Sequence, residues 1–194
     1  MPARKPRPPA PTTLPIWQEA AAFAARAHRH QIRKDGKTPY ISHVVRVALT
    51  VTQLFGCDDP VVIGAALLHD TIEDTTTDYE DILERFGGEI AACVAALTKN
   101  MALPEKERED EYDRRLARAD WRARLIKLAD TYDNFCDIES WSGSDPEKHV
   151  TKKREAYEKC VRAIALARAD KGSAMMRRAA AHVQALIAPY EKGR

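Results

Sequence analysis

Apolar residues recur at the three- and four-residue spacing of helices along most of the chain, and no stretch of any length alternates apolar with polar residues as a strand would. Glycine and proline interrupt this pattern between segments, most visibly in the polar loop 33–39. The pattern predicts helices over residues 16–28, 43–55, 61–68, 79–86, 89–98, 120–138, about 147–168 and about 173–188. We therefore expect an all-α protein with a single domain over residues 16–190.

Residues with suitable capping chemistry mark several helix starts. Ser42 is expected to cap the second helix, and either Thr77 or Asp78 to cap the fourth, because their side-chain oxygens can accept a bond from a first-turn N–H group. Asp59 and Pro60 are expected to open the third helix, since proline is tolerated in a first turn.

The third helix leads directly into a group of charges. Its segment 61–68 is apolar on every side, which predicts a buried central helix, and His69, Asp70, Glu73 and Asp74 follow within six positions. A buried charge must be paired, bind a metal ion or be neutralised. Helical spacing places His69 and Glu73 on one face and Asp70 and Asp74 on the next, so one pair can bind an ion while the other reaches a substrate. Taken alone, such a pair also fits a hydrogen-bonded core histidine beside an acid that ends its helix.

Two further segments favour the metal interpretation. His43 begins a predicted helix, and Asp130 lies along the helix 120–138 beside its apolar stripe. Asp133 and Asp137 continue the same edge, where like charges repel unless they face solvent or a cation. We interpret Asp133 and Asp137 as solvent-facing or salt-bridged, and Asp130 as part of a site. Imidazole and carboxylate donors together suit Mn²⁺, Fe²⁺, Mg²⁺ or Zn²⁺.

Composition narrows the classes of partner. The chain has 31 lysines and arginines against 29 aspartates and glutamates, which argues against a histone-like nucleic-acid binder. Three of the basic residues lie in the proline-rich segment 1–15, which we expect to be a flexible tail. Residues 105–115 are almost all charged and predict a solvated helix face or a mobile connection. Nothing in the sequence decides the oligomeric state.

Cysteine spacing and hydropathy bear on location. The four cysteines lie far apart and form no CxxC pair, so we expect reduced thiols rather than a zinc site or a disulfide scaffold. No stretch has the length of a membrane span, and no apolar run follows the basic residues near the N-terminus as in a secretory signal. We expect a cytoplasmic protein without a membrane partner.

Three ordered motifs carry a family resemblance. They are residues 33–43 (RKDGKTPYISH), residues 65–75 (AALLHDTIEDT), and residues 127–130 (KLAD) with Asn134. Together they resemble the HD phosphohydrolase superfamily and, within it, the hydrolase domain of the Rel/Spo stringent-response enzymes and of the stand-alone small alarmone hydrolases. The resemblance covers about residues 17–165. In a chain of 194 residues such a domain uses nearly the whole length, so we expect a stand-alone form that only degrades alarmones.

The resemblance implies roles for individual residues. It implies one Mn²⁺ ion held by His43, His69, Asp70 and Asp130. It also implies that the acid pair Glu73 and Asp74 works on the attacking water, and that Arg33, Lys34, Asn134 and Tyr157 contact the nucleotide. Lys37 lies in the same basic loop and is expected to help neutralise the phosphates. The implied reaction removes the 3′-pyrophosphate of (p)ppGpp and yields GDP or GTP.

The chain departs from the family pattern at two places. Val44 follows His43 where the family usually has proline, and residues 131–133 (Thr-Tyr-Asp) stand where a basic residue, leucine and His or Tyr are usual. An acid at Asp133 beside a phosphate-rich substrate bears on substrate preference rather than on the metal site. Two alternatives stay open: an HD hydrolase of another nucleotide, such as ppApp, NADPH or a dNTP, and a non-catalytic HD regulatory module.

Overall fold

The computed structural model of the chain describes residues 14–138, 146–168, 170 and 173–192. The predicted tail lies almost entirely outside these residues, as do residues 139–145, which separate the helices predicted over 120–138 and about 147–168. The described residues form helices and one isolated antiparallel bridge, between Ile32 and Pro39. The all-α class predicted from the sequence is confirmed.

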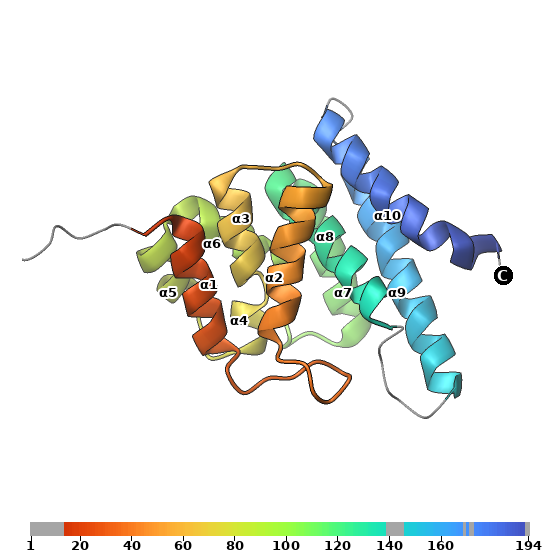
Figure 1. Ribbon diagram of the computed structural model, residues 1–194, viewed down its shortest axis with the longest axis horizontal. Helices are drawn as coiled ribbons and strands as arrows, with labels where there is room; N and C mark the ends of the chain where they lie inside the picture. Colours follow the sequence, from red (N-terminus) through yellow and green to blue (C-terminus); the bar gives the residue numbers. More distant parts are fainter. Residues whose placement is uncertain (1–13, 139–145, 169, 171–172, 193–194) are drawn as a thin grey trace, which may run out of the picture.

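Helices follow one another along the whole described chain (Figure 1). They are α1 (Ile16–Ala27), α2 (Ile41–Leu49), the π-helical turn η1 (Thr50–Leu54), α3 (Pro60–Leu68), α4 (Thr71–Asp74), α5 (Tyr79–Phe86), α6 (Gly88–Leu97), α7 (Glu105–Arg118), α8 (Trp121–Asp137), α9 (Pro146–Ala167) and α10 (Ala174–Lys192). Each predicted helix is present, and the last continues beyond its predicted end. The charged segment 105–115 is the solvated helix α7, which buries only Tyr112 and Leu116.

The prediction that Ser42 caps the second helix is wrong. The helix α2 begins at Ile41, one residue earlier, and no side chain caps it. The backbone closes the first turn instead, because the Ser42 N–H donates to the carbonyl oxygen of Pro39 at 3.1 Å. The Ser42 hydroxyl accepts a hydrogen bond from Arg46 at 3.4 Å.

The other predicted helix starts are confirmed. Asp59 accepts a hydrogen bond from the Val61 N–H at 2.8 Å and so caps α3. Asp78 accepts from the Asp81 N–H at 2.9 Å, and the Asp81 side chain accepts in return from the Asp78 N–H at 3.1 Å. This reciprocal capping box selects Asp78 rather than Thr77 as the residue that starts α5.

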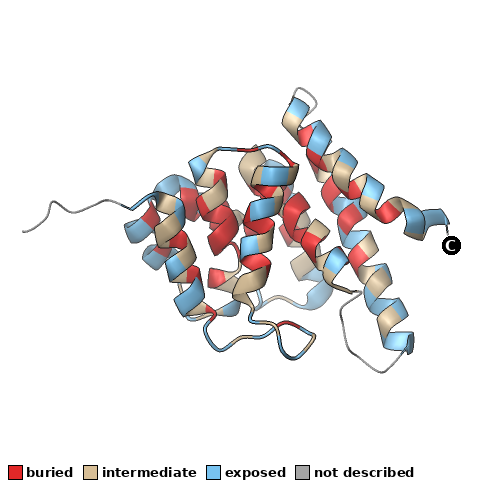
Figure 2. Cartoon of the chain, viewed as in Figure 1, coloured by how far each residue is buried: buried red, intermediate tan, exposed pale blue. Residues whose placement is uncertain are grey.

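The apolar helix α3 lies at the centre of the helical core, where α1, α2, α6 and α8 pack around it. Six of its nine residues are buried, and Figure 2 shows buried residues concentrated where these helices meet. Gly64 permits a close approach of α6, since a Cβ atom there would lie 2.8 Å from the Ile90 Cδ1 atom. The end of α3 is therefore held by packing from several sides.

The helix α8 lies between α2 on one side and α9 with α10 on the other (Figure 1). The helices α9 and α10 run antiparallel to each other against α8. This arrangement places the middle of α8 opposite the end of α3 and the start of α2. In the described parts of the chain, no helix combines the length and apolarity needed to cross a lipid bilayer.

Candidate metal centre and the cavity beside it

Three helices bring the four predicted metal ligands to one place. The helix α3 ends at Leu68, and His69 and Asp70 form the turn before α4. His43 comes from the first turn of α2, and Asp130 from the middle of α8. The ligands thus come from elements that the buried core fixes relative to one another.

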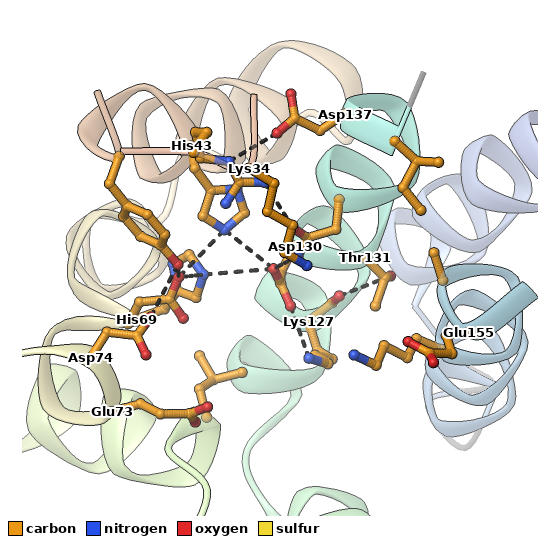
Figure 3. Close-up of a pocket in the computed structure, with 18 of the residues that line it drawn as sticks. Lys34, His43, His69, Glu73, Asp74, Lys127, Asp130, Thr131, Asp137 and Glu155 are labelled. Atoms are coloured by element: carbon orange, nitrogen blue, oxygen red, sulfur yellow. Dashed lines mark hydrogen bonds and ion pairs between the residues drawn. The ribbon is translucent and has the colours of Figure 1, made fainter. Parts of the chain in front are cut away.

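The donor atoms of these four side chains lie close together (Figure 3). His43 Nε2 lies 3.4 Å from Asp70 Oδ2 and 3.3 Å from Asp130 Oδ1. His69 Nε2 lies 3.1 Å from Asp70 Oδ2 and 3.8 Å from Asp130 Oδ1. Ligand atoms of His43, His69 and Asp130 all lie within 4.8 Å of one another. Two imidazole nitrogens and two carboxylates in one place are sufficient to bind a divalent cation.

Hydrogen bonds orient both imidazole rings toward this point. The Nδ1 atom of His43 lies 2.7 Å from Asp133 Oδ2, and that of His69 lies 2.8 Å from the Ala66 carbonyl oxygen. Metal-binding histidines are usually held in this way through their second ring nitrogen. The Nε2 atom of His69 is buried and makes no hydrogen bond within the described structure. A buried ring nitrogen that lies 3.1 Å from the Asp70 carboxylate without forming a hydrogen bond requires an explanation, and a metal ion held between the two provides one.

The charge state of the cluster suits a cation. Burial opposes the charged form of His43, but hydrogen bonds to Asp130, Asp133 and Asp70 outweigh it and raise the pKa of His43 to about 9. Burial likewise opposes charge on His69, yet the carboxylates raise the pKa of His69 well above its ordinary value. Although burial favours protonation, neighbouring cationic groups hold the pKa of Asp70 and of Asp130 well below the usual range. Carboxylates that stay charged while buried attract positive charge.

The acid pair borders the same cavity. Glu73 and Asp74 lie in the single turn α4, which is separated from α3 by the turn at Asp70, so they do not continue one helix as the spacing predicted. The Lys99 N–H donates to Glu73 Oε2 at 2.7 Å. The Tyr40 hydroxyl donates to Asp70 at 2.6 Å and to Asp74 at 3.1 Å. Burial raises the pKa of Glu73 and of Asp74, which makes both better proton acceptors near neutral pH.

The cluster and the acid pair line a cavity of about 440 Å³. Of the predicted nucleotide contacts, Arg33, Lys34 and Asn134 line this cavity. Lys37 and Tyr157 do not line it in this structure. The cavity is large enough for part of a nucleotide and offers cationic side chains next to the metal centre.

Arg33 connects the loop 33–39 to α8 through hydrogen bonds. Its Nε donates to Asp137 at 2.9 Å, and its Nη2 donates to Asn134 at 3.0 Å. The Asn134 side-chain amide in turn donates to Asp130 Oδ1 at 2.5 Å. A chain of hydrogen bonds therefore connects the loop to the metal centre, and the prediction of a salt-bridged Asp137 is confirmed.

The two predicted contacts outside the cavity have partners elsewhere. The backbone N–H of Lys37 donates to Asp35 at 3.0 Å within the loop. The Tyr157 hydroxyl donates to Glu191 at 3.1 Å, and its ring centroid lies 5.1 Å from that of Tyr190. Tyr157 therefore packs between α9 and α10.

Asp133 has a second role that sequence reasoning missed. The sequence allowed for a salt bridge at Asp133, and the structure has one to Arg46 at 2.6 Å. Asp133 also forms a hydrogen bond with the His43 ring, and it is only 5% exposed. Asp133 does not line the cavity, so its charge does not face the space open to a substrate. The position three residues after Asp130 on α8 was the available signal.

The cavity residues without a predicted role include Tyr40, Lys99, Lys127 and Lys159. Tyr40 and Lys127 stand inside the family motifs, next to residues that did receive roles. Lys99 and Lys159 lie in segments without a motif, and only the packing of α6 and α9 against α8 brings them to the cavity.

Comparison with known proteins identifies similar chains. The pattern of the family described as HD domain matches residues 20–159. The human protein named guanosine-3′,5′-bis(diphosphate) 3′-pyrophosphohydrolase MESH1 is 42% identical over 130 residues, which cover 64% of this chain and 73% of the relative. The Drosophila melanogaster protein of the same name is 36% identical over 143 residues, 73% of this chain and 78% of the relative. A guanosine-3′,5′-bis(diphosphate) 3′-pyrophosphohydrolase of Aquifex aeolicus is 46% identical over 143 residues, 72% of this chain but 20% of that longer protein.

A solved structure shares the fold over nearly the full length. It is described as a metazoan orthologue of SpoT that hydrolyses ppGpp and plays a role in starvation responses. The match has a TM-score of 0.73 and 27% sequence identity, and covers 92% of this chain and 97% of that one.

Proposed function

This chain belongs to the HD domain family and, within it, to the family of the MESH1 guanosine-3′,5′-bis(diphosphate) 3′-pyrophosphohydrolases, and on that premise we propose that it is a Mn²⁺-dependent hydrolase of ppGpp and pppGpp. One observation carries the proposal: a cluster of two histidines and two carboxylates lies beside an acid pair, and both line the same cavity. A cytoplasmic location is part of the proposal, supported by four cysteines that form no disulfide.

The proposed metal ligands are His43, His69, Asp70 and Asp130. Mn²⁺ accepts this mixture of imidazole and carboxylate donors. When bound, the ion supplies Lewis-acid polarisation of the reacting phosphoryl group and makes water more acidic. Asp133 and the Ala66 carbonyl keep the histidine Nε2 atoms directed at the ion.

In the proposed reaction, the acid pair receives the proton of the attacking water. The water oxygen forms a bond to the phosphorus attached to ribose O3′, the bond from that phosphorus to O3′ breaks, and O3′ takes up a proton. The products are pyrophosphate and GDP or GTP. The raised pKa values of Glu73 and Asp74 support proton acceptance by either one. Tyr40 holds Asp74 against Asp70 and so keeps the acid near the ligands.

Cationic side chains offset the charge of the substrate. Arg33 and Lys34 line the cavity from the loop, and Asn134 joins Arg33 to the metal centre. Phosphoryl transfer depends mainly on such positioning and electrostatic stabilisation. The proposed contacts of Lys37 and Tyr157 rest on the sequence match alone.

A panel of nucleotides tests the proposal. The purified chain is incubated with Mn²⁺ and ppGpp, pppGpp, ppApp, NADPH or a dNTP, and released pyrophosphate, phosphate and triphosphate are measured. We expect pyrophosphate from ppGpp and pppGpp. Phosphate from NADPH or triphosphate from a dNTP would select another nucleotide as substrate, and hydrolysis of none would select the regulatory module.

Variants of the ligands separate the metal role from folding. In His69→Ala and in Asp70→Ala, we expect manganese-dependent activity to fall to background while the helical circular dichroism is retained. His30→Ala is the matched control, because His30 is exposed and lies outside the cavity. Full activity in either ligand variant would contradict the metal assignment.

A further inference from the structure

Three lysines from separate segments converge at one end of the cavity. Lys99 follows α6, Lys127 belongs to α8 and Lys159 to α9, and all three line both the main cavity and a small pocket that adjoins it. The ring of Tyr112 lies beside two of them, with the ammonium nitrogens of Lys99 and Lys127 at 5.4 and 5.3 Å from its centroid. We call Lys99, Lys127 and Lys159 the lysine cluster.

Positive charge exceeds negative charge in the lysine cluster. Lys99 pairs with Glu109 at 2.6 Å, and Lys127 pairs with Asp130 at 2.8 Å. Lys159 has no ion pair or hydrogen bond within the described residues. Because Asp130 is also a proposed metal ligand, its charge is shared with the ion, and among the described residues Glu109 is the other carboxylate that pairs with the cluster.

The ammonium groups of the cluster repel one another. Partial burial, together with the nearby charges of Lys99 and Lys127, lowers the pKa of Lys159. Lys159 nevertheless remains exposed and lines the cavity, so a ligand that enters from solvent can reach it. An anion placed among the three lysines would relieve this repulsion and form charge-assisted hydrogen bonds.

The lysine cluster lies directly beside the reacting centre. Lys127 contacts the metal ligand Asp130, and the backbone N–H of Lys99 contacts Glu73 of the acid pair. In Figure 3, Lys127 lies below Asp130 with a dashed line joining the two. Arg33, by contrast, reaches Asp130 only through Asn134. Lys127 therefore lies directly against the metal centre, and the lysine cluster is adjacent to a phosphorus atom bound there.

We propose that Lys99, Lys127 and Lys159 form the subsite for the terminal phosphate of the substrate's 3′-diphosphate. In that diphosphate the terminal phosphate shares one bridging oxygen with the phosphorus that water attacks, so it must lie next to the metal centre. The subsite makes the enzyme select a 3′-diphosphate over a 3′-monophosphate. This inference rests on the proposed function, since it assigns the scissile phosphorus to the metal centre.

The sharpest test changes Lys159, because it is exposed and its loss should leave the fold intact. Lys159→Met is compared with Arg154→Met, an exposed residue of the same helix that does not line the cavity. Each protein is assayed with ppGpp and with guanosine 5′-diphosphate 3′-monophosphate. We expect Lys159→Met to lower kcat/KM for ppGpp by about tenfold, the size of one lost charge-assisted contact, with the 3′-monophosphate and Arg154→Met unchanged.

A binding measurement decides the subsite independently of turnover. The Mn²⁺-loaded protein is titrated calorimetrically with pyrophosphate and with phosphate, with Mn²⁺ equal in both solutions. We expect Lys159→Met to weaken pyrophosphate binding about tenfold and phosphate binding hardly at all. Equal losses for both substrates, or unchanged pyrophosphate binding, would overturn the subsite while leaving the hydrolase intact. A wild type that hydrolyses neither nucleotide would overturn the proposed function, and pyrophosphate titration would still decide whether the lysine cluster binds a diphosphate.

Discussion

The two flanks of Asp130 differ in how their charges are balanced. On the histidine side, Asp133 binds both His43 and Arg46, so each buried charge has an opposite partner. On the lysine side, Lys99 pairs with Glu109 and Lys127 pairs with Asp130, which is also a proposed metal ligand. Lys159 pairs with no carboxylate in the described structure.

This difference indicates that one side positions a metal-binding side chain and the other side binds the substrate. A buried network whose members all have partners resists movement and fixes the direction of the His43 ring. A group of like charges without enough partners is costly to assemble and gains most when an anion arrives. The histidine side is therefore expected to determine metal affinity, and the lysine side to determine affinity for the phosphates.

The largest effect is expected on the histidine side. Asp133→Asn keeps the shape of the side chain but removes the negative charge that supports His43. Loss of such a partner typically weakens metal binding 10- to 100-fold, and we expect about 100-fold for this buried contact. Titration of activity with Mn²⁺ measures the change, and saturating Mn²⁺ should restore most of kcat. An unchanged manganese requirement would show that Asp133 serves the fold alone.

On the lysine side, we expect a substitution to weaken substrate binding without weakening metal binding. Lys127→Met keeps the aliphatic stem but removes the ammonium group that contacts Asp130. We expect kcat/KM for ppGpp to fall about 20-fold, because a hydrogen bond to a charged group is worth about 1.5–3 kcal/mol. Mn²⁺ should bind as tightly as before or more tightly, because a cation that repels the metal ion is gone. Weaker metal binding in Lys127→Met would remove the distinction between the two flanks.

Local patterns made the helices and the proposed metal ligands predictable. An apolar run that ends in His69 and Asp70 can be read from neighbouring residues, and so can the capping box at Asp78. The N-terminal boundary of α2 could not be read in this way. Ser42 has capping chemistry, but the backbone turn after Pro39 had already started the helix.

Most of the site residues that the sequence did not predict lie on a helix whose orientation about its own axis cannot be read from the sequence. Ala156 lines the cavity while Tyr157, about 100° further around α9, packs against α10. Lys159 shares the cavity face with Ala156, but that face is defined only by how α9 packs on α8. Asp133 was expected to be solvent-facing or salt-bridged because sequence spacing does not show which neighbouring helix covers it.

A smaller effect is expected at Tyr40, whose hydroxyl joins the metal centre to the acid pair. Tyr40→Phe removes the hydroxyl that donates to Asp70 and Asp74. Loss of a net contribution of about 1 kcal/mol predicts a fall in kcat of about fivefold. The KM for ppGpp should stay the same, since Tyr40 acts on the acids. A change in KM with constant kcat would place the Tyr40 hydroxyl in contact with the nucleotide instead.

The smallest effect is expected at Arg46, the outer member of the histidine-side network. Its guanidinium donates to Asp133 at 2.6 and 2.9 Å but is 38% exposed, so solvent screens much of its charge. We expect Arg46→Gln to weaken Mn²⁺ binding about threefold, because partly exposed ion pairs contribute about 0.2–1 kcal/mol. A double-mutant cycle with Asp133→Asn identifies the route of this effect. If Arg46 acts only by holding Asp133, its substitution should have no effect on metal affinity once Asp133 is changed. Equal effects in both backgrounds would show that Arg46 acts by a route other than Asp133, such as its ion pair with Asp137 at 3.2 Å.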